Sequence, residues 1–321
     1  MEGTTKTVLI HAAILVVVGV SIFLIAMAVN HWDFSKISTI QYVTNTHTVK
    51  DDFTGICVET NTADVLFAIS DDETCKVVCR EQDKMQHSVG VQNGILQIHM
   101  VNTRKWYEYI GISFGQPQIT LYLPQSAYDS VTVDASTSDV ALPRELTFEN
   151  MQITVKTGDV SNFASVTQTG KIQTKTGKIW VEDIHAGALD LSVTTGHVTV
   201  RNVRCREDVT VGVSTGDTRL TDLTCKNLSS TGSTGDLSLT NVVANGKFSL
   251  ERSTGDIRFT KCDAAEISVE TSTGDVTGSL LSDKVYMTQT STGRIDVPKT
   301  TTGGKCEIST DTGNIKIQTE E

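Results

Sequence analysis

Carboxylates at one fixed place in a repeated motif are the side chains of this sequence best suited to do chemistry. Four successive copies of a Ser-Thr-Gly-Asp-like motif carry an acid directly after the glycine: Asp217, Asp236, Asp256 and Asp275. Stacked about 4.8 Å apart, such carboxylates could bind Ca²⁺, which takes about six to eight oxygen ligands. Other residue types interrupt the same column, namely Lys178, His197, Arg294 and Asn314. We favour turn chemistry, in which each Asp accepts a hydrogen bond from a backbone amide, and keep calcium as the alternative.

Catalysis by these carboxylates is disfavoured because they are alike. General acid–base chemistry needs two carboxylates in unlike environments, and a repeat supplies equivalent ones. The sequence also contains no Gly-x-Ser-x-Gly elbow, His-Glu-x-x-His helix or phosphate-binding loop. We predict no enzyme activity, no catalytic residue and no cofactor. A β-helix enzyme that acts on polysaccharide is the alternative.

Three aromatic residues, Trp106, Tyr107 and Tyr109, lie together in a segment that begins at Arg104. Exposed aromatic rings can stack on sugar rings, so these three are candidate ligand-binding residues. Covering an edge of the fold is the competing role for them.

The seven cysteines are an odd number, and no pair has the Cys-x-x-Cys spacing of a zinc or thioredoxin-like site. Cys205 and Cys225 each lie nine residues after the glycine of a Ser-Thr-Gly-Asp-like motif. If successive repeats stack on one another as rungs, the two cysteines occupy the same position in adjacent rungs. A rung spacing of about 4.8 Å lies within the Cα–Cα range of disulfides, about 4.4 to 6.8 Å. This pair is the predicted disulfide, and most of the other cysteines are predicted to be small apolar core residues.

The repeat itself indicates which elements position these side chains. Its glycine recurs every 19 or 20 residues, with Ser138 one period before the first, at positions 158, 177, 196, 216, 235, 255, 274, 293 and 313. Apolar residues dominate the second and fourth places after the glycine and the fifth and seventh before it, and polar residues stand between them. This alternation predicts two half-buried strands per repeat, joined at a glycine corner. Residues 131–321 are accordingly predicted to form a parallel β-solenoid, in which each repeat pairs its backbone with its neighbours.

Residues 40–130 alternate in the same way but have irregular turn signals. Gln92-Asn93-Gly94 is typical of a hairpin turn between two strands. We predict that this region is a β-rich cap, which protects the first rung from edge-to-edge pairing.

Residues 8–29 contain no Asp, Glu, Lys or Arg, and they are long enough to cross about 30 Å of hydrocarbon as a helix. A cleaved signal peptide is the alternative, although its apolar stretch usually runs only about 7 to 15 residues. We predict that residues 1–7 are a cytoplasmic leader, 8–29 a single-pass anchor in membrane lipid, and 30–39 a juxtamembrane linker. The C-terminal ectodomain would then lie outside the cytoplasm.

The net charge of the chain disfavours one class of binding partner. Lys and Arg number 27 against 38 Asp and Glu, so the net charge is -11. A chain this acidic repels phosphate backbones, and nucleic acid is not an expected partner.

Several segments give residues 40–321 a resemblance to a known family: TADVLFAIS, NGILQI, RKWYEYIGISFG, ITLYLP and the Ser-Thr-Gly-Asp units. The chain resembles the bacterial putative-adhesin, β-strand-repeat family of unknown function, in its membrane-anchored Gram-positive form. The resemblance implies a solenoid-like fold and a location in the cell envelope. It transfers no catalytic residue, because the family has none established.

These observations together predict a non-enzymatic, membrane-anchored surface protein. Such a protein would bind or scaffold at the cell envelope, with cell-wall polymer or a surface protein as its partner. The alternative is an envelope-stress sensor or modulator that acts through a partner membrane protein. A seven-residue inner tail is short for relaying a signal alone.

The orientation of the anchor is testable with protease. Because the apolar run begins at Val8, the solenoid should lie outside the cytoplasmic membrane, and protease added to intact protoplasts should degrade it. Immunoblotting against the C-terminal residues measures the loss. Complete protection, with a cytoplasmic control protein equally intact, would reverse the orientation.

Overall fold

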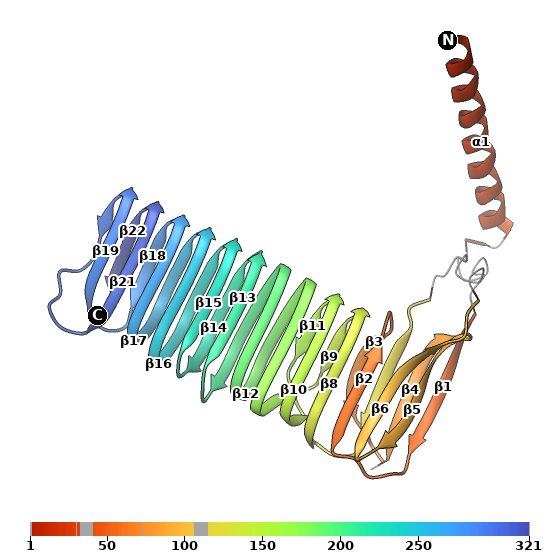
Figure 1. Cartoon of the computed structure of the whole chain (residues 1–321), viewed down its shortest axis with the longest axis horizontal. Helices are drawn as coiled ribbons and strands as arrows, with labels where there is room; N and C mark the ends of the chain where they lie inside the picture. The colour runs from red at the N-terminus through yellow and green to blue at the C-terminus, as the bar shows by residue number, and fades with distance from the viewer. Residues whose placement is uncertain (1, 30, 33–40, 73, 106–114, 321) are drawn as a thin grey trace.

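The computed structural model describes residues 2–29, 31–32, 41–72, 74–105 and 115–320. A single helix, α1 (Glu2–Val29), comes first in these described residues, and strands β1 to β22 follow it (Figure 1). The stretch Lys6–Val29 is long and apolar enough to cross a membrane, a property that signal sequences share. All the strands belong to one hydrogen-bonded sheet, which winds along the molecule as a parallel β-solenoid. The predicted fold class is confirmed.

Each rung consists of one strand before the motif glycine and one strand after it. In the middle of the stack, β13 (Val209–Thr215) leads into Gly216 and β14 (Thr218–Cys225) leaves it. β13 lies parallel to β15 (Leu228–Thr234), and β14 lies parallel to β16 (Leu237–Thr254). Residues at the same place in the repeat lie opposite each other, as the sequence columns predict.

The other strands of the regular stack follow the same scheme, and some run through a corner without a break. They are β8 (Ala127–Thr137), β9 (Val140–Leu142), β10 (Thr147–Thr157), β11 (Val160–Asn162), β12 (Ser165–Cys205), β17 (Ile257–Thr273) and β18 (Val276–Leu280).

The N-terminal region contributes two further rungs and then closes the stack. Its strands are β1 (Tyr42–Val49), β2 (Gly55–Thr60), β3 (Asp64–Ile69), β4 (Cys75–Gln82), β5 (Met85–Gln92), β6 (Ile95–Asn102) and β7 (Gln118–Leu123). β2 and β3 lie parallel to β8 and β9, and β6 and β7 lie parallel to β2 and β3 on the other side. The stack is thus continuous across residue 131.

Antiparallel strands end the stack at this side. β5 pairs with β6, β4 pairs with β7, and β1 pairs with β4, all antiparallel. The predicted hairpin at Gln92-Asn93-Gly94 is confirmed, since Asn93 and Gly94 both have positive φ and join β5 to β6.

The C-terminal end departs from sequence order. Its strands are β19 (Lys284–Thr292), β20 (Ile295–Asp296), β21 (Gly304–Thr312) and β22 (Ile315–Thr319). β21 pairs with β17 on one side and with β19 on the other, and β22 likewise lies between β18 and β20. The last repeat of the sequence is therefore inserted between the two repeats before it, where simple stacking in chain order would have placed it outermost (Figure 1).

Side-chain polarity explains this insertion. The inserted repeat has Ile308, Ile315 and Ile317 in its inward columns, and all three are buried. The outer repeat has Thr288 at the place of Ile308, and its Ile295 is 44% exposed. Placing the more polar repeat at the open end leaves less apolar surface in water, which is what a terminal rung of a solenoid requires.

One hydrophobic cluster fills the solenoid from Phe53 to Ile317. The inward columns predicted from sequence are buried along the stack up to the outer C-terminal repeat, including Ile172, Val211 and Leu250. Even the polar members of these columns, such as Thr218, Ser230 and Asn162, point inward and are buried.

The glycine corner requires glycine for two reasons. All nine motif glycines have positive φ, between 128° and 157°, a region that side chains rarely adopt. In addition, each corner lies against the previous one: a Cβ on Gly216 would lie 1.7 Å from the carbonyl oxygen of Gly196, and one on Gly235 would lie 2.1 Å from that of Gly216. A methyl group at either position would push neighbouring rungs apart.

Two alanine substitutions separate the corner from an ordinary strand glycine. Gly235→Ala should destabilise the solenoid by several kcal/mol, about 3 or more, because it adds a backbone clash to an unfavourable φ. Gly212→Ala should be neutral or stabilising by about 0.4–1 kcal/mol, since its Cβ would find no atom closer than 3.8 Å. Thermal unfolding followed by circular dichroism measures both, and equal midpoints for the two variants would contradict the corner geometry.

Candidate functional site

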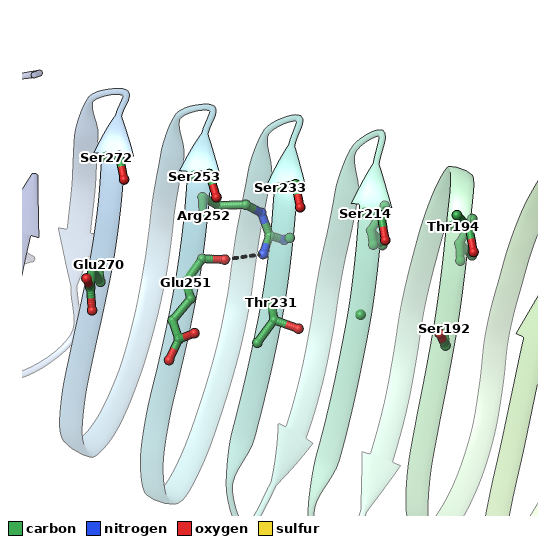
Figure 2. A pocket seen from close by; sticks show the side chains of 14 residues that line it. Ser192, Thr194, Ser214, Thr231, Ser233, Glu251, Arg252, Ser253, Glu270 and Ser272 are labelled. Atoms are coloured by element: carbon green, nitrogen blue, oxygen red, sulfur yellow. Dashed lines mark hydrogen bonds between the residues drawn. The ribbon is translucent and has the colours of Figure 1, made fainter. Parts of the chain in front are cut away.

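A polar groove crosses five rungs on the face of the sheet that leads into the glycine corners (Figure 2). Its volume is about 470 Å³. The strands that form it are β12, β13, β15, β16 and β17, and each contributes the outward positions two and four residues before its glycine. Hydroxyl groups dominate these positions: Ser192, Thr194, Ser214, Thr231, Ser233, Ser253 and Ser272. At the position two before the glycine, every one of the five rungs presents a hydroxyl group, and these groups lie about 4.8 Å apart.

Two glycines lie in the middle of the groove. Gly212 and Gly232 stand on neighbouring rungs among the lining residues, where they project no side chain. Gly212 is open to the groove, whereas Gly232 has the guanidinium of Arg252 against it, 3.1 Å from where a Cβ would be. Glycine at 232 thus makes room for the Arg252 side chain.

Arg252 occupies an inward position and is 4% exposed. Its Nη2 donates to Thr218 Oγ1 at 3.2 Å and to Ser230 Oγ at 3.0 Å, and its Nη1 donates to the carbonyl oxygen of Glu251 at 2.7 Å. Burial lowers the pKa of Arg252 to about 10, which leaves the guanidinium charged at neutral pH. Thr218 and Ser230 are polar interruptions of two otherwise mainly apolar columns, and their role is to satisfy this buried cation.

The charge of the groove comes from two carboxylates on its outer side. Glu251 and Glu270 are both exposed and stand on adjacent rungs among the lining residues. Figure 2 shows them on the same face as the hydroxyl groups. A negatively charged ligand would meet repulsion here, whereas a neutral, hydroxyl-rich ligand would meet hydrogen-bond donors and acceptors.

The Asp column forms a ladder at the neighbouring corner edge. The backbone N–H of Asp236 donates to Asp217 Oδ1 at 3.2 Å, that of Asp256 to Asp236 Oδ1 at 3.0 Å, and that of Asp275 to Asp256 Oδ1 at 2.9 Å. The amide of Asp256 and the guanidinium of Arg258 lower the pKa of Asp236 below its ordinary value. Each carboxylate thus bonds the next rung's amide, which is the turn role expected from sequence. Calcium binding by Asp217, Asp236, Asp256 and Asp275 stays a prediction.

The second corner of five successive rungs has a left-handed residue at a fixed position after the motif glycine. Six residues after the motif glycine, the backbone has a left-handed conformation, with φ between 50° and 57°, at Asp183, Asn202, Asp222, Asn241 and Lys261. Asn202 donates to Asp183 Oδ1 at 2.7 Å, and Asn241 donates to Asp222 Oδ1 at 2.9 Å. The signal was present in the sequence as an Asp/Asn column, since these residues tolerate positive φ.

The predicted disulfide pair lies in the core as two thiols. Cys205 and Cys225 are both buried, and the register of β12 with β14 puts them in one column on adjacent rungs. The Cys205 thiol contacts the Gly187 carbonyl oxygen at 3.0 Å, and burial raises the pKa of Cys225 to about 12. Their oxidation stays a prediction. The candidate aromatic residues Trp106, Tyr107 and Tyr109 lie outside the described residues.

A double-mutant cycle tests the role of Thr218. Thr218→Val restores the apolar pattern of its column, yet it should cost about 1–3 kcal/mol because it leaves a guanidinium N–H of Arg252 unsatisfied. In the background Arg252→Thr, which introduces the residue found at the same place at Thr174 and Thr271, that cost should vanish. Urea unfolding of the four proteins measures the coupling, and strictly additive effects would show that Thr218 does not serve Arg252.

The chain is similar to one known family and to several solved structures. A family model described as Toastrack DUF4097 matches residues 53–211 and 204–321. A solved structure described as a "putative lipid binding protein" from Parabacteroides distasonis ATCC 8503 has 17% identity and a TM-score of 0.48, over 75% of this chain and 95% of that one. A "putative adhesin" from Bacteroides fragilis NCTC 9343 has 13% identity and a TM-score of 0.42, over 87% of this chain and 97% of that one.

A "putative adhesin" from Parabacteroides merdae ATCC 43184 has 12% identity and a TM-score of 0.43, over 75% of this chain and 97% of that one. The search of curated proteins finds no match. The family model covers well over half of the sequence, including the rungs, the Asp ladder and the hydroxyl-lined groove. This chain belongs to the Toastrack DUF4097 family.

Proposed function

We propose that this protein is a membrane-tethered, non-enzymatic binding module of the cell envelope, whose groove holds one extended, neutral, hydroxyl-rich polymer. The observation that carries the proposal is the groove itself. On five successive rungs it offers a hydroxyl group two residues before the glycine, which is a repeated feature suited to a repeated ligand. Many weak contacts along one polymer chain would add up to useful avidity.

The electrostatics favour a neutral polymer over an anionic one. Glu251 and Glu270 stand in the groove, and the whole chain has a net charge of -11. The nearest cation, the Arg252 guanidinium, is buried and already donates to Thr218, Ser230 and the carbonyl oxygen of Glu251. Polysaccharides carry the hydroxyl and amide groups that such a surface can bind, and we propose that they are the ligand class.

The absence of turnover is part of the proposal. Glu251 and Glu270 are both exposed, so nothing sets one apart as an acid and the other as a base. The buried cation supports the core and makes its hydrogen bonds within the protein. Binding without chemistry suits this arrangement.

The membrane tether is proposed from α1. Lys6–Val29 has the length and composition of a spanning helix, and it precedes the solenoid in the chain. With the N-terminal end inside, the anchor would hold the solenoid on the outer side of the membrane, where envelope polymer is found.

A groove-filling variant with a matched control tests the function. Gly212→Tyr places a ring into the open middle of the groove, whereas Ser238→Tyr places the same ring on an outward position of β16 that does not line it. Full-length protein in detergent micelles is co-sedimented with peptidoglycan sacculi, with and without their anionic polymers removed. Gly212→Tyr should lose binding at least about tenfold, which is about 1.4 kcal/mol, and Ser238→Tyr should bind like the wild type.

Two results would contradict the proposal. Equal binding by both variants would show that the groove is not the site. Release of reducing ends from the sacculi by the wild-type protein would show that it is an enzyme. Removal of the anionic polymers should leave binding unchanged or improve it, since the groove is acidic.

A further inference from the structure

A second group of chemically active side chains lies at the N-terminal end of the stack, where β1 pairs with β4. His47 of β1 and Cys79 and Glu81 of β4 bring one ligand atom each to within 4.8 Å of the other two. Cys79 and Glu81 are almost fully buried, with exposures of 0% and 1%. In the described part of the chain, this is the one group of three His, Cys, Asp or Glu residues whose ligand atoms all lie within 4.8 Å of one another.

The imidazole of His47 has one nitrogen atom whose hydrogen-bonding capacity is not satisfied in the described part of the chain. Its Nε2 atom is buried and has no hydrogen-bond partner among the described residues. Buried polar atoms are almost always paired, so a native structure needs a reason for each one that is not. The unpaired nitrogen belongs to the same group as a thiol and a carboxylate, and these are three of the atoms that bind zinc in proteins.

We propose that His47, Cys79 and Glu81 bind one divalent cation of the zinc class, as a structural clasp between β1 and β4. A tetrahedral zinc site with bonds of about 2.0–2.3 Å has its ligand atoms about 3.3–3.8 Å apart, so these side chains need to move by only about 1 Å. A water molecule would supply the fourth ligand. The mixed nitrogen, sulfur and oxygen set excludes Ca²⁺ and Mg²⁺, which take oxygen ligands.

A second layer of residues holds the carboxylate in place. Asn45 Nδ2 donates to Glu81 Oε1 at 2.8 Å, and the backbone N–H of His87 donates to Oε2 at 2.7 Å. The ring Nδ1 of His87 also lies 2.7 Å from Oε2, and its Nε2 lies 3.0 Å from Thr60 Oγ1. Such supports orient metal ligands in known sites, and their loss typically weakens metal affinity about 10- to 100-fold.

The position of β1 at the end of the stack indicates what a cation bound between β1 and β4 would do. Among the described strands, β1 is the outermost at this end, and β4 is the strand with which it pairs. It is also the first strand of the described chain after the helix, so a pull on the anchor would reach it first. A cation held by both strands would fasten β1 to the stack.

The test uses full-length protein in detergent micelles, without a histidine tag, reduced and freed of metal. Co²⁺ alone is the probe, because cobalt bound to a thiolate gives a charge-transfer band in the near ultraviolet and intense visible bands when tetrahedral. The wild type should take up one Co²⁺ per chain with both signals, and Zn²⁺ should displace it. Cys79→Ser should lose the charge-transfer band, His47→Ala should weaken cobalt affinity at least tenfold, and Asn45→Ala should weaken it about tenfold.

Cys75→Ser is the matched control. Cys75 lies on the same strand and the same buried face as Cys79, but it is not in the ligand group, so its variant should bind cobalt like the wild type. Far-ultraviolet circular dichroism confirms that each variant is folded. A folded wild-type protein that takes up well under one cobalt per chain would overturn the proposal, whatever the variants do. A charge-transfer band that persists in Cys79→Ser, or that disappears in Cys75→Ser, would also overturn it.

Discussion

The close contact between consecutive corner glycines is the constraint on which the rest of this solenoid depends. Each corner carbonyl occupies the space that a Cβ would need on the next rung, so the corners can stack only in one register. Because the register is fixed there, the apolar columns meet in the core and the Asp side chains reach the next rung's amides. The same stacking brings the hydroxyl groups of five rungs into one groove.

The regular part of this fold could be predicted from sequence because aligned repeats share one pattern of buried positions and turns. The positive φ of every motif glycine and the burial of positions such as Val211 and Leu250 follow from the alignment. The order of the rungs at the two ends could not be predicted in this way. Near-identical repeats can pair with any neighbour, and the choice is made by small differences, such as Thr288 in the outer repeat against Ile308 in the inserted one.

The candidate site was only partly visible in the sequence for a similar reason. Thr218 and Ser230 stand out as polar residues in core columns, but their common partner, Arg252, lies 34 and 22 residues away. The open middle of the groove depends on Gly212, and the place of Arg252 depends on Gly232; the lack of a side chain at either position matters only once neighbouring rungs are in place. The cluster of His47, Cys79 and Glu81 depends on an antiparallel pairing outside the repeat, so the repeat gives no information about it.

Disulfide trapping at the C-terminal end tests the stacking account most directly. Ser309 of the inserted repeat lies opposite Glu270 on one side and opposite Gln289 on the other. With cysteines at Glu270→Cys and Ser309→Cys, about 4.8 Å apart between Cα atoms, oxidation should form a disulfide that mass spectrometry of the peptides detects. With Glu270→Cys and Gln289→Cys, about two rungs apart, it should form none. A disulfide in the second pair and none in the first would mean that the repeats stack in chain order, and it would contradict the structure described for this end.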